Sequence, residues 1–135
     1  MELTIFEEHQ MANHITAADA PRFGQDGFDM TGLAAPSRGC STLSTWRIRA
    51  QPGAASPVHR LTSDEAFVVV RGELTATLDG QDVVVRAGDS LSVPPGVDFR
   101  IANRSAEPFE AIASMAAGGQ ATVGDGAPFT PPWAA

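Results

Sequence analysis

Between residues 28 and 115, short apolar segments alternate with turn-forming residues, and this pattern limits the possible folds more than any other feature of the chain. Breaks fall at Pro52-Gly53, at Asp79-Gly80 and again at 94–96. Many short strands at such spacing are typical of a β-sandwich or β-barrel, whereas a parallel sheet needs helices between its strands. We therefore predict an all-β domain with strands at 28–34, 42–50, 65–71, 73–78, 82–86, 90–93, 98–103 and 108–115.

The residues of one break, Asp79-Gly80, also predict the type of turn. Asp79-Gly80 separates the alternating segment 74–78 from the valine run 83–85. A two-residue type I′ turn needs positive φ at both central residues, which Asp-Gly tolerates well. We therefore expect a tight antiparallel hairpin here.

The two ends of the chain lack the strand pattern. Residues 1–27 are polar and mixed, with only a loose helical period over 7–14, and we interpret them as an N-terminal arm. Residues 118–135 are rich in Gly, Ala and Pro, which predicts an irregular C-terminal tail docked by Phe129 and Trp133. The predicted β-barrel domain lies between them, at 28–117.

Composition narrows the possible partners and chemistry. The formal net charge is −7 and all nine cationic residues are scattered arginines, so we expect no binding to nucleic acid or to an anionic membrane surface. The absence of lysine and tyrosine removes Schiff-base chemistry and a phenolic acid. Cys40 is the single cysteine, and no 20-residue apolar run occurs. The acidic N-terminus leads us to expect no secretory signal. We expect a cytoplasmic location.

Two spaced motifs carry the most specific information. In the first, Gly53 is followed at fixed intervals by His59, Glu65 and Gly72, with Leu61 two residues after the histidine. In the second, Gly88, Pro94, Gly96 and Asn103 are spaced in the same regular way, with Phe99 between the last two.

These motifs resemble the two motifs of the cupin family, over roughly residues 46–115. Every glycine, proline and asparagine of the family pattern fits, while two family histidines are replaced by Leu61 and Phe99. The resemblance implies a small single-domain cupin: a double-sheet jelly-roll β-barrel with an internal ligand pocket. Strand alternation places the expected ligand-binding side chains in that interior: Trp46, Ile48, Leu61, Phe67, Phe99, Ile101 and Met115.

The resemblance also implies a divalent metal held by three histidines and one glutamate, of which only His59 and Glu65 are present. Two protein ligands fall short of the three that catalytic sites normally supply. We therefore expect a degenerate metal site and no cofactor, with weakly held Fe, Mn, Zn or Ni on His59 and Glu65 as the alternative. His9 and His14 are the other histidines, and we expect them to be solvated.

Three interpretations of His59 and Glu65 remain open. They form a ligand-contacting or catalytic acid–base pair in an apolar pocket, or a mutually hydrogen-bonded pair that only sustains packing, or a reduced metal site. The leading hypothesis is a cupin that binds a small organic ligand, either as a binding module or as a metal-independent isomerase, cyclase or lyase. The alternatives are a metal-dependent dioxygenase or isomerase and a non-catalytic ligand sensor. We expect a homodimer.

Overall fold

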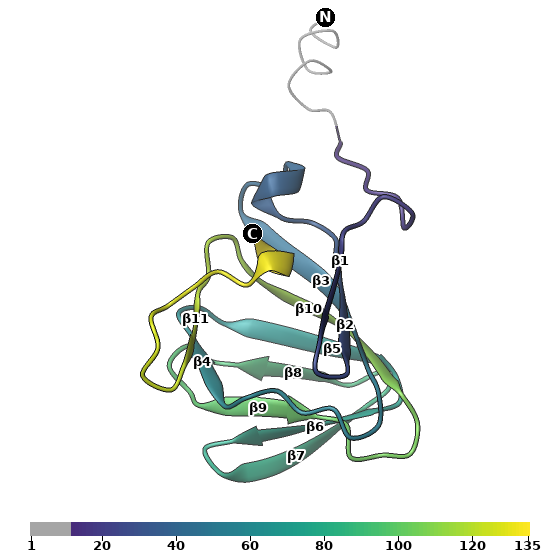
Figure 1. Ribbon diagram of the computed structural model, residues 1–135, viewed down its shortest axis with the longest axis vertical. Helices are drawn as coiled ribbons and strands as arrows, with labels where there is room; N and C mark the ends of the chain where they lie inside the picture. The colour runs from purple at the N-terminus through teal and green to yellow at the C-terminus, as the bar shows by residue number, and fades with distance from the viewer. Residues whose placement is uncertain (1–11) are drawn as a thin grey trace, which may run out of the picture.

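The computed structural model describes residues 12–135 and consists of two facing antiparallel sheets (Figure 1). The six-stranded sheet contains, in spatial order, β1 (Arg22–Gln25), β2 (Phe28–Gly32), β3 (Leu43–Ala50), β10 (Phe109–Ala116), β5 (Glu65–Arg71) and β8 (Ser90–Val93). The five-stranded sheet contains β11 (Ala121–Val123), β4 (His59–Leu61), β9 (Phe99–Ala102), β6 (Glu73–Leu78) and β7 (Gln81–Arg86).

The predicted all-β jelly roll is confirmed. Among residues 12–135 the helical elements are two single-turn 3₁₀ helices, η1 (Pro36–Arg38) and η2 (Pro132–Ala134). The two sheets remain separate, so the barrel is a sandwich that is open along its sides. Part of the expected 7–14 segment, including His9, lies outside the described residues.

Three strands, β1, β4 and β11, lie where the sequence predicted none. β1 falls inside the expected arm and pairs with β2 through a turn at Asp26-Gly27, where both residues have positive φ. β11 falls inside the expected irregular tail and pairs with β4. Each strand has only three or four residues, which is too short to show an alternating pattern, and each forms because a neighbouring strand supplies its hydrogen-bond partners.

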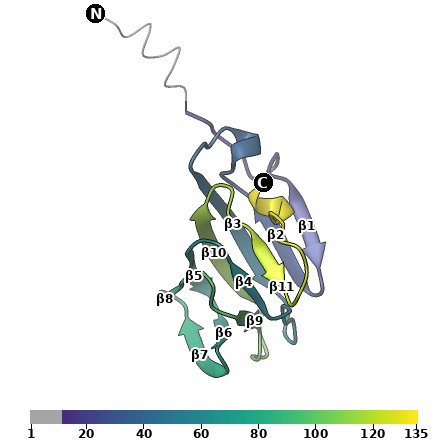
Figure 2. The same cartoon turned by 90° about the vertical axis from the view of Figure 1, so that its left-hand side faces the viewer.

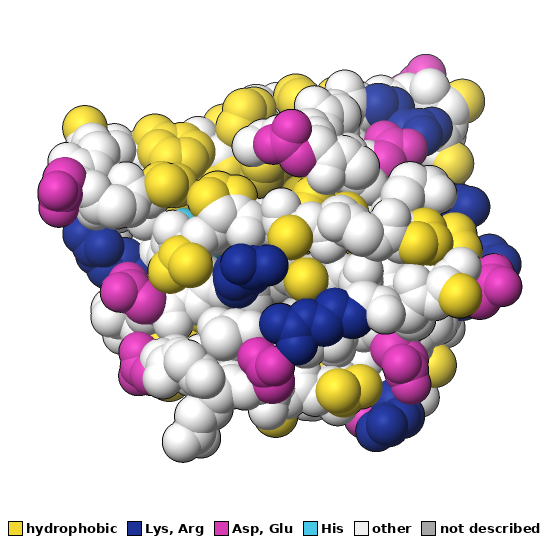
Figure 3. All heavy atoms as spheres, turned by 60° about the horizontal axis from the view of Figure 1, so that its bottom comes forward, with side chains coloured by type: hydrophobic (Ala, Val, Ile, Leu, Met, Phe, Trp, Pro, Cys, Tyr) yellow, Lys and Arg dark blue, Asp and Glu magenta, His cyan; other side chains and the backbone are white. Residues whose placement is uncertain are grey.

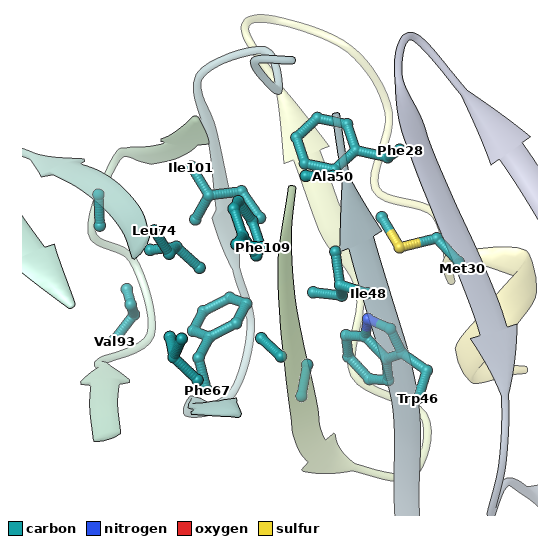
Figure 4. Packing of buried hydrophobic residues seen from close by; sticks show 14 of the residues in the cluster. Phe28, Met30, Trp46, Ile48, Ala50, Phe67, Leu74, Val93, Ile101 and Phe109 are labelled. Carbon is teal, nitrogen blue, oxygen red and sulfur yellow. The ribbon is translucent and has the colours of Figure 1, made fainter. Parts of the chain in front are cut away.

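The core follows the predicted alternation. Along β10, Phe109, Ala111, Ala113 and Met115 point inward, and the residues between them are partly exposed. Trp46 and Ile48 of β3, and Phe67 of β5, are buried in the same layer between the sheets. Figure 4 shows Phe67 and Phe109 next to Leu74 and Ile101 of the opposite sheet.

The β6–β7 hairpin has the predicted turn. Asp79 has φ of 48° and Gly80 has φ of 81°, as a type I′ turn requires. Gly72, the last glycine of the first motif, also has positive φ, and a Cβ there would lie 2.6 Å from the carbonyl oxygen of Pro108. The motif glycine therefore allows β5 to pass into β6 against the start of β10.

Asn103, the last residue of the second motif, connects two loops from inside the fold. Its buried side chain donates hydrogen bonds to the carbonyl oxygens of Ala50 (3.0 Å) and Glu107 (2.8 Å). Its Oδ1 accepts from the main-chain N–H and the hydroxyl of Ser105. One amide side chain thus satisfies four polar groups, three in its own loop and one at the end of β3.

We expect Asn103→Ala to lower the free energy of unfolding by about 2–3 kcal/mol, because it leaves the buried carbonyl of Ala50 without a partner. Ser105→Ala is the matched control. It removes one hydroxyl near the surface and should cost less than about 1 kcal/mol. Urea unfolding of both variants measures the difference, and equal losses would mean that Asn103 does not fix these loops.

Candidate functional site

A cavity of about 160 Å³ lies between the two sheets and opens beside β11. Its floor and walls come from the inner faces of β2, β3, β5 and β10 on one side and of β4 and β9 on the other. The lining is predominantly hydrocarbon, aromatic and thioether. Such a concave, mostly apolar space with a few polar groups is the usual form of a small-molecule site.

The cavity contains most of the side chains expected from the sequence. Its lining includes His59 and Glu65 together with six of the seven apolar candidates: Trp46, Ile48, Leu61, Phe67, Ile101 and Met115. They come from β3, β4, β5, β9 and β10, so five strands that are distant in sequence supply one surface.

Phe99 differs from the expectation. It is fully buried but does not line the cavity. Its ring lies behind His59, with the ring centroids 4.3 Å apart, and makes an edge-to-face contact with Phe67 at 6.3 Å. His59 and Phe99 are direct cross-strand partners, and the imidazole covers the phenyl ring from the cavity side.

Several lining residues were missed by the sequence reasoning. Phe28 and Met30 of β2 form part of the wall, as does the 55–57 segment before β4. The other missed wall is the end of the chain, which contributes Phe129, Pro131, Pro132 and Trp133. The only sequence signal was the presence of two aromatic residues in an otherwise small-residue tail.

His59 is held by its own loop. Its Nδ1 lies 2.9 Å from the carbonyl oxygen of Pro57. A carbonyl can only accept, so Nδ1 carries the proton and Nε2 is the acceptor of the neutral ring. Burial lowers the pKa of His59, and the Pro57 hydrogen bond partly offsets that effect. At neutral pH the ring is therefore an uncharged base.

Glu65 is an isolated buried carboxyl group. It is 6% exposed, and within residues 12–135 neither a hydrogen bond nor an ion pair reaches its side chain. Burial raises its pKa to about 8, because a low-dielectric site disfavours the charged form. The group is therefore predominantly a neutral carboxylic acid at pH 7, and its oxygens keep contact with the cavity.

His59 and Glu65 do not pair with each other. An ion pair or hydrogen bond between them is absent from the described structure, and His59 is held instead by Pro57. The interpretation as a mutually hydrogen-bonded packing pair is therefore wrong. β4 and β5 lie in different sheets, so the two groups reach the cavity from opposite layers.

Trp46 adds a polar group that the sequence reasoning treated only as apolar. The side chain is 3% exposed, and its Nε1–H makes no hydrogen bond to residues 12–135. Figure 4 shows this nitrogen on the side of the ring toward Ile48, another lining residue. Buried indole N–H groups usually find a partner, so this donor is open to an occupant of the cavity.

The donor set does not fit the metal that the cupin resemblance implies. No group of three or more His, Cys, Asp or Glu residues that could hold an ion occurs in the described part of the chain. Leu61 contributes hydrocarbon to the cavity wall, and Phe99 packs behind His59. Neither can replace the hydration that a divalent ion loses. The residues present therefore do not fit a resident divalent metal.

The remaining candidate side chains lie elsewhere. His14 borders a separate surface depression with Asn13, Arg38 and Cys40, so it does not contribute to the cavity between the sheets. Charged side chains of both signs are mixed over the face seen in Figure 3, and arginines do not form a continuous stripe there.

Comparison with known proteins decides the family. The model of the cupin domain matches residues 46–115, which is just over half of the 135 residues. The chain belongs to the cupin family. In this cupin the match begins at Trp46 and ends at Met115, and both residues line the cavity.

Solved structures share the fold at low sequence identity. A sugar phosphate isomerase of the cupin superfamily from Silicibacter pomeroyi is 20% identical, with a TM-score of 0.69 over 84% of this chain and 82% of that one. An RmlC-like cupin from Shewanella frigidimarina is 24% identical, with a TM-score of 0.66 over 78% and 91%. The polyketide cyclase RemF from Streptomyces resistomycificus is 14% identical, with a TM-score of 0.69 over 78% and 80%.

Among curated proteins, the chain is similar to auxin-binding protein 5 of Zea mays. The two are 26% identical over 88 residues, which cover 64% of this chain and 58% of the maize protein. The chain thus spans less than two thirds of the length of this relative. In residues 12–135 we find no helix that is both long and apolar enough to cross a bilayer.

Proposed function

We propose that this cupin binds a small, uncharged and mostly apolar organic molecule in the cavity between its sheets, without a resident metal. One observation carries the proposal. The cavity is apolar, yet it exposes the Glu65 carboxyl and the Trp46 N–H, neither of which has a partner in the described structure.

Unpaired buried polar groups normally cost free energy. The Glu65 oxygens and Trp46 Nε1 keep some contact with the cavity and are not among the fully buried unpaired atoms of the described residues. In an apolar cavity a polar group without a hydrogen bond still costs up to about 1–3 kcal/mol, so apolar residues would serve the core better at these positions. A ligand that supplies an acceptor for Trp46 and a donor or acceptor for Glu65 would remove the cost. Both groups are therefore expected to contact the bound molecule.

The lining also indicates what the ligand is not. It contains neither arginine nor lysine, so a phosphate group or a small dianion would enter without a counter-charge. The substrates named for the sugar phosphate isomerase and for an oxalate decarboxylase from Lactobacillus farciminis, another structure with this fold, are therefore poor candidates here. A neutral ring compound matches the lining better.

Acid–base chemistry on such a ligand is the second candidate. His59 is an uncharged base and Glu65 a protonated acid in the same cavity. They approach from opposite sheets, and pairs of groups with pKa values pushed apart are typical of proton-transfer sites. This arrangement favours a metal-independent isomerase, cyclase or lyase, in which His59 removes a proton and Glu65 donates one.

We expect uncharged ring compounds such as indole or phenol to raise the melting temperature by roughly 4 °C at ten times Kd. Glucose 6-phosphate and oxalate should have no effect, because the cavity offers them no cation. Val123→Trp, at the partly exposed mouth, should abolish the shift by filling the entrance. Val70→Trp, on the outer sheet face, is the matched control. Shifts with the anions alone would contradict the proposal.

A further inference from the structure

The end of the chain forms a fixed wall of the cavity, which we call the C-terminal strap (residues 129–133). Figures 1 and 2 show this segment leaving β11, crossing the open side of the sandwich and ending beside β3. Phe129, Pro131, Pro132 and Trp133 of the strap all line the cavity. The strap therefore replaces the side wall that the two separate sheets leave open.

Hydrogen bonds hold both ends of the strap. At one end, Phe129 and Ala121 exchange two main-chain bonds of 2.8 and 2.9 Å. At the other end, Arg38 Nη2 donates to the carbonyl of Trp133 at 3.1 Å, and the buried hydroxyl of Ser44 donates to the carbonyl of Ala134 at 2.6 Å. The donors Arg38 and Ser44 belong to η1 and to β3, so the strap is attached to the body of the domain.

The span between these attachments is stiff. Pro131 and Pro132 each have a ring-fixed φ, and η2 begins at Pro132. The indole of Trp133 is braced from outside by Phe23 of β1, edge-to-face at 6.4 Å. A wall that is ordered before binding adds little entropic cost when a ligand arrives.

The surface presented by this wall and the strands opposite it includes five aromatic side chains. Both tryptophans of the chain line the cavity, together with Phe28, Phe67 and Phe129. Met30 and Met115 add thioethers, which contact aromatic rings favourably. Aromatic pairs contribute attraction beyond the area they bury, so this lining distinguishes a planar ring from a saturated one of equal size.

We propose that the C-terminal strap and Trp46 select a planar aromatic ring that carries a hydroxyl or carbonyl oxygen. The inference rests on the proposed function and specifies its ligand class. The cavity of about 160 Å³ is close to the 150 Å³ that accommodates benzene in an engineered apolar site. One ring fills the enclosed part, a second ring reaches the half-exposed Phe129 at the mouth, and the oxygen accepts from Trp46 Nε1–H.

Two alcohols with the same carbon skeleton test the ring selection. Calorimetric titration of the full chain should show 1-naphthol binding about fivefold more tightly than decahydro-1-naphthol. Phe129→Leu, which keeps the apolar area and loses the π-face, should reduce that ratio to about twofold. Leu43→Ala, on an exposed side chain outside the cavity, should leave it unchanged.

Trp46→Phe tests the polar contact, with naphthalene as the comparison ligand. The substitution should weaken the binding of 1-naphthol about fivefold more than that of naphthalene, because both ligands lose the same apolar contact and only the alcohol also loses a hydrogen bond. Equal binding of the aromatic and saturated alcohols would overturn the inference while the proposed function stands. If neither alcohol nor any uncharged ring compound binds, the proposed function fails and the inference fails with it.

Discussion

The Glu65→Gln variant should gain free energy of unfolding relative to the wild type as the pH rises. The difference between the two proteins should be about 4 kcal/mol larger at pH 8 than at pH 4.5. In the folded wild type, the carboxyl group must either stay protonated or be buried as an unpaired charge. Glutamine does not ionise, so the variant avoids both costs. The amide has nearly the same shape, so packing around β5 and β10 is retained. The effect should appear as a difference in pH dependence rather than as a constant shift.

The sign follows from proton linkage. The unfolded chain releases this proton near pH 4.5, whereas the folded protein holds it until about pH 8. Between these values the folded state binds one more proton, so raising the pH favours unfolding by about 1.4 kcal/mol per unit. The wild type therefore loses stability over this window and the Glu65→Gln variant does not.

Guanidinium unfolding of both proteins at intervals from pH 4.5 to 9 measures the effect. His59, whose lowered pKa adds its own pH dependence below 6.5, is common to both proteins and cancels in the difference. Glu107→Gln is the control, because that side chain is exposed. Parallel stability curves for wild type and Glu65→Gln would show that Glu65 is not isolated in the folded protein.

Restoring the two missing histidines should convert the cavity into a metal site. Leu61→His and Phe99→His together would supply four ligands with His59 and Glu65, because Leu61 follows His59 on the same face of β4 and Phe99 is its cross-strand partner. Without metal, each new imidazole enters an apolar setting and should destabilise the fold by about 1–3 kcal/mol. With zinc or nickel at 100 times Kd, binding to the folded state should return about 2.7 kcal/mol.

Thermal melts with and without metal compare three proteins. The wild type should gain much less from the same metals, because two ligands from opposite sheets hold an ion weakly. The Leu61→Gln and Phe99→Gln double variant provides similar polarity without imidazole and should show no such recovery. If the double histidine variant responds no more than the wild type, positions 61 and 99 do not reach a common centre.

The sequence alone determined the family and most of the sandwich. The spacing of Gly53, Gly72, Gly88 and Gly96 indicated where the backbone must turn, and alternation along β3, β5 and β10 predicted which side chains face inward. Both are local properties: positive φ at a glycine and opposite side-chain directions in a strand follow from a few neighbouring residues. The expected homodimer and cellular location stay predictions.

Only the tertiary structure decided the character of the site. The strap lies about 70 residues after His59 in sequence, and its contact with Arg38 and Ser44 joins segments roughly 90 residues apart. Whether His59 pairs with Glu65, whether Phe99 faces the cavity, and whether Trp46 finds a hydrogen-bond partner all depend on how the two sheets pack. Periodicity assigns a side chain to one face of a strand. The residue it contacts on that face comes from a distant part of the chain, and a local sequence pattern does not specify which residue that is.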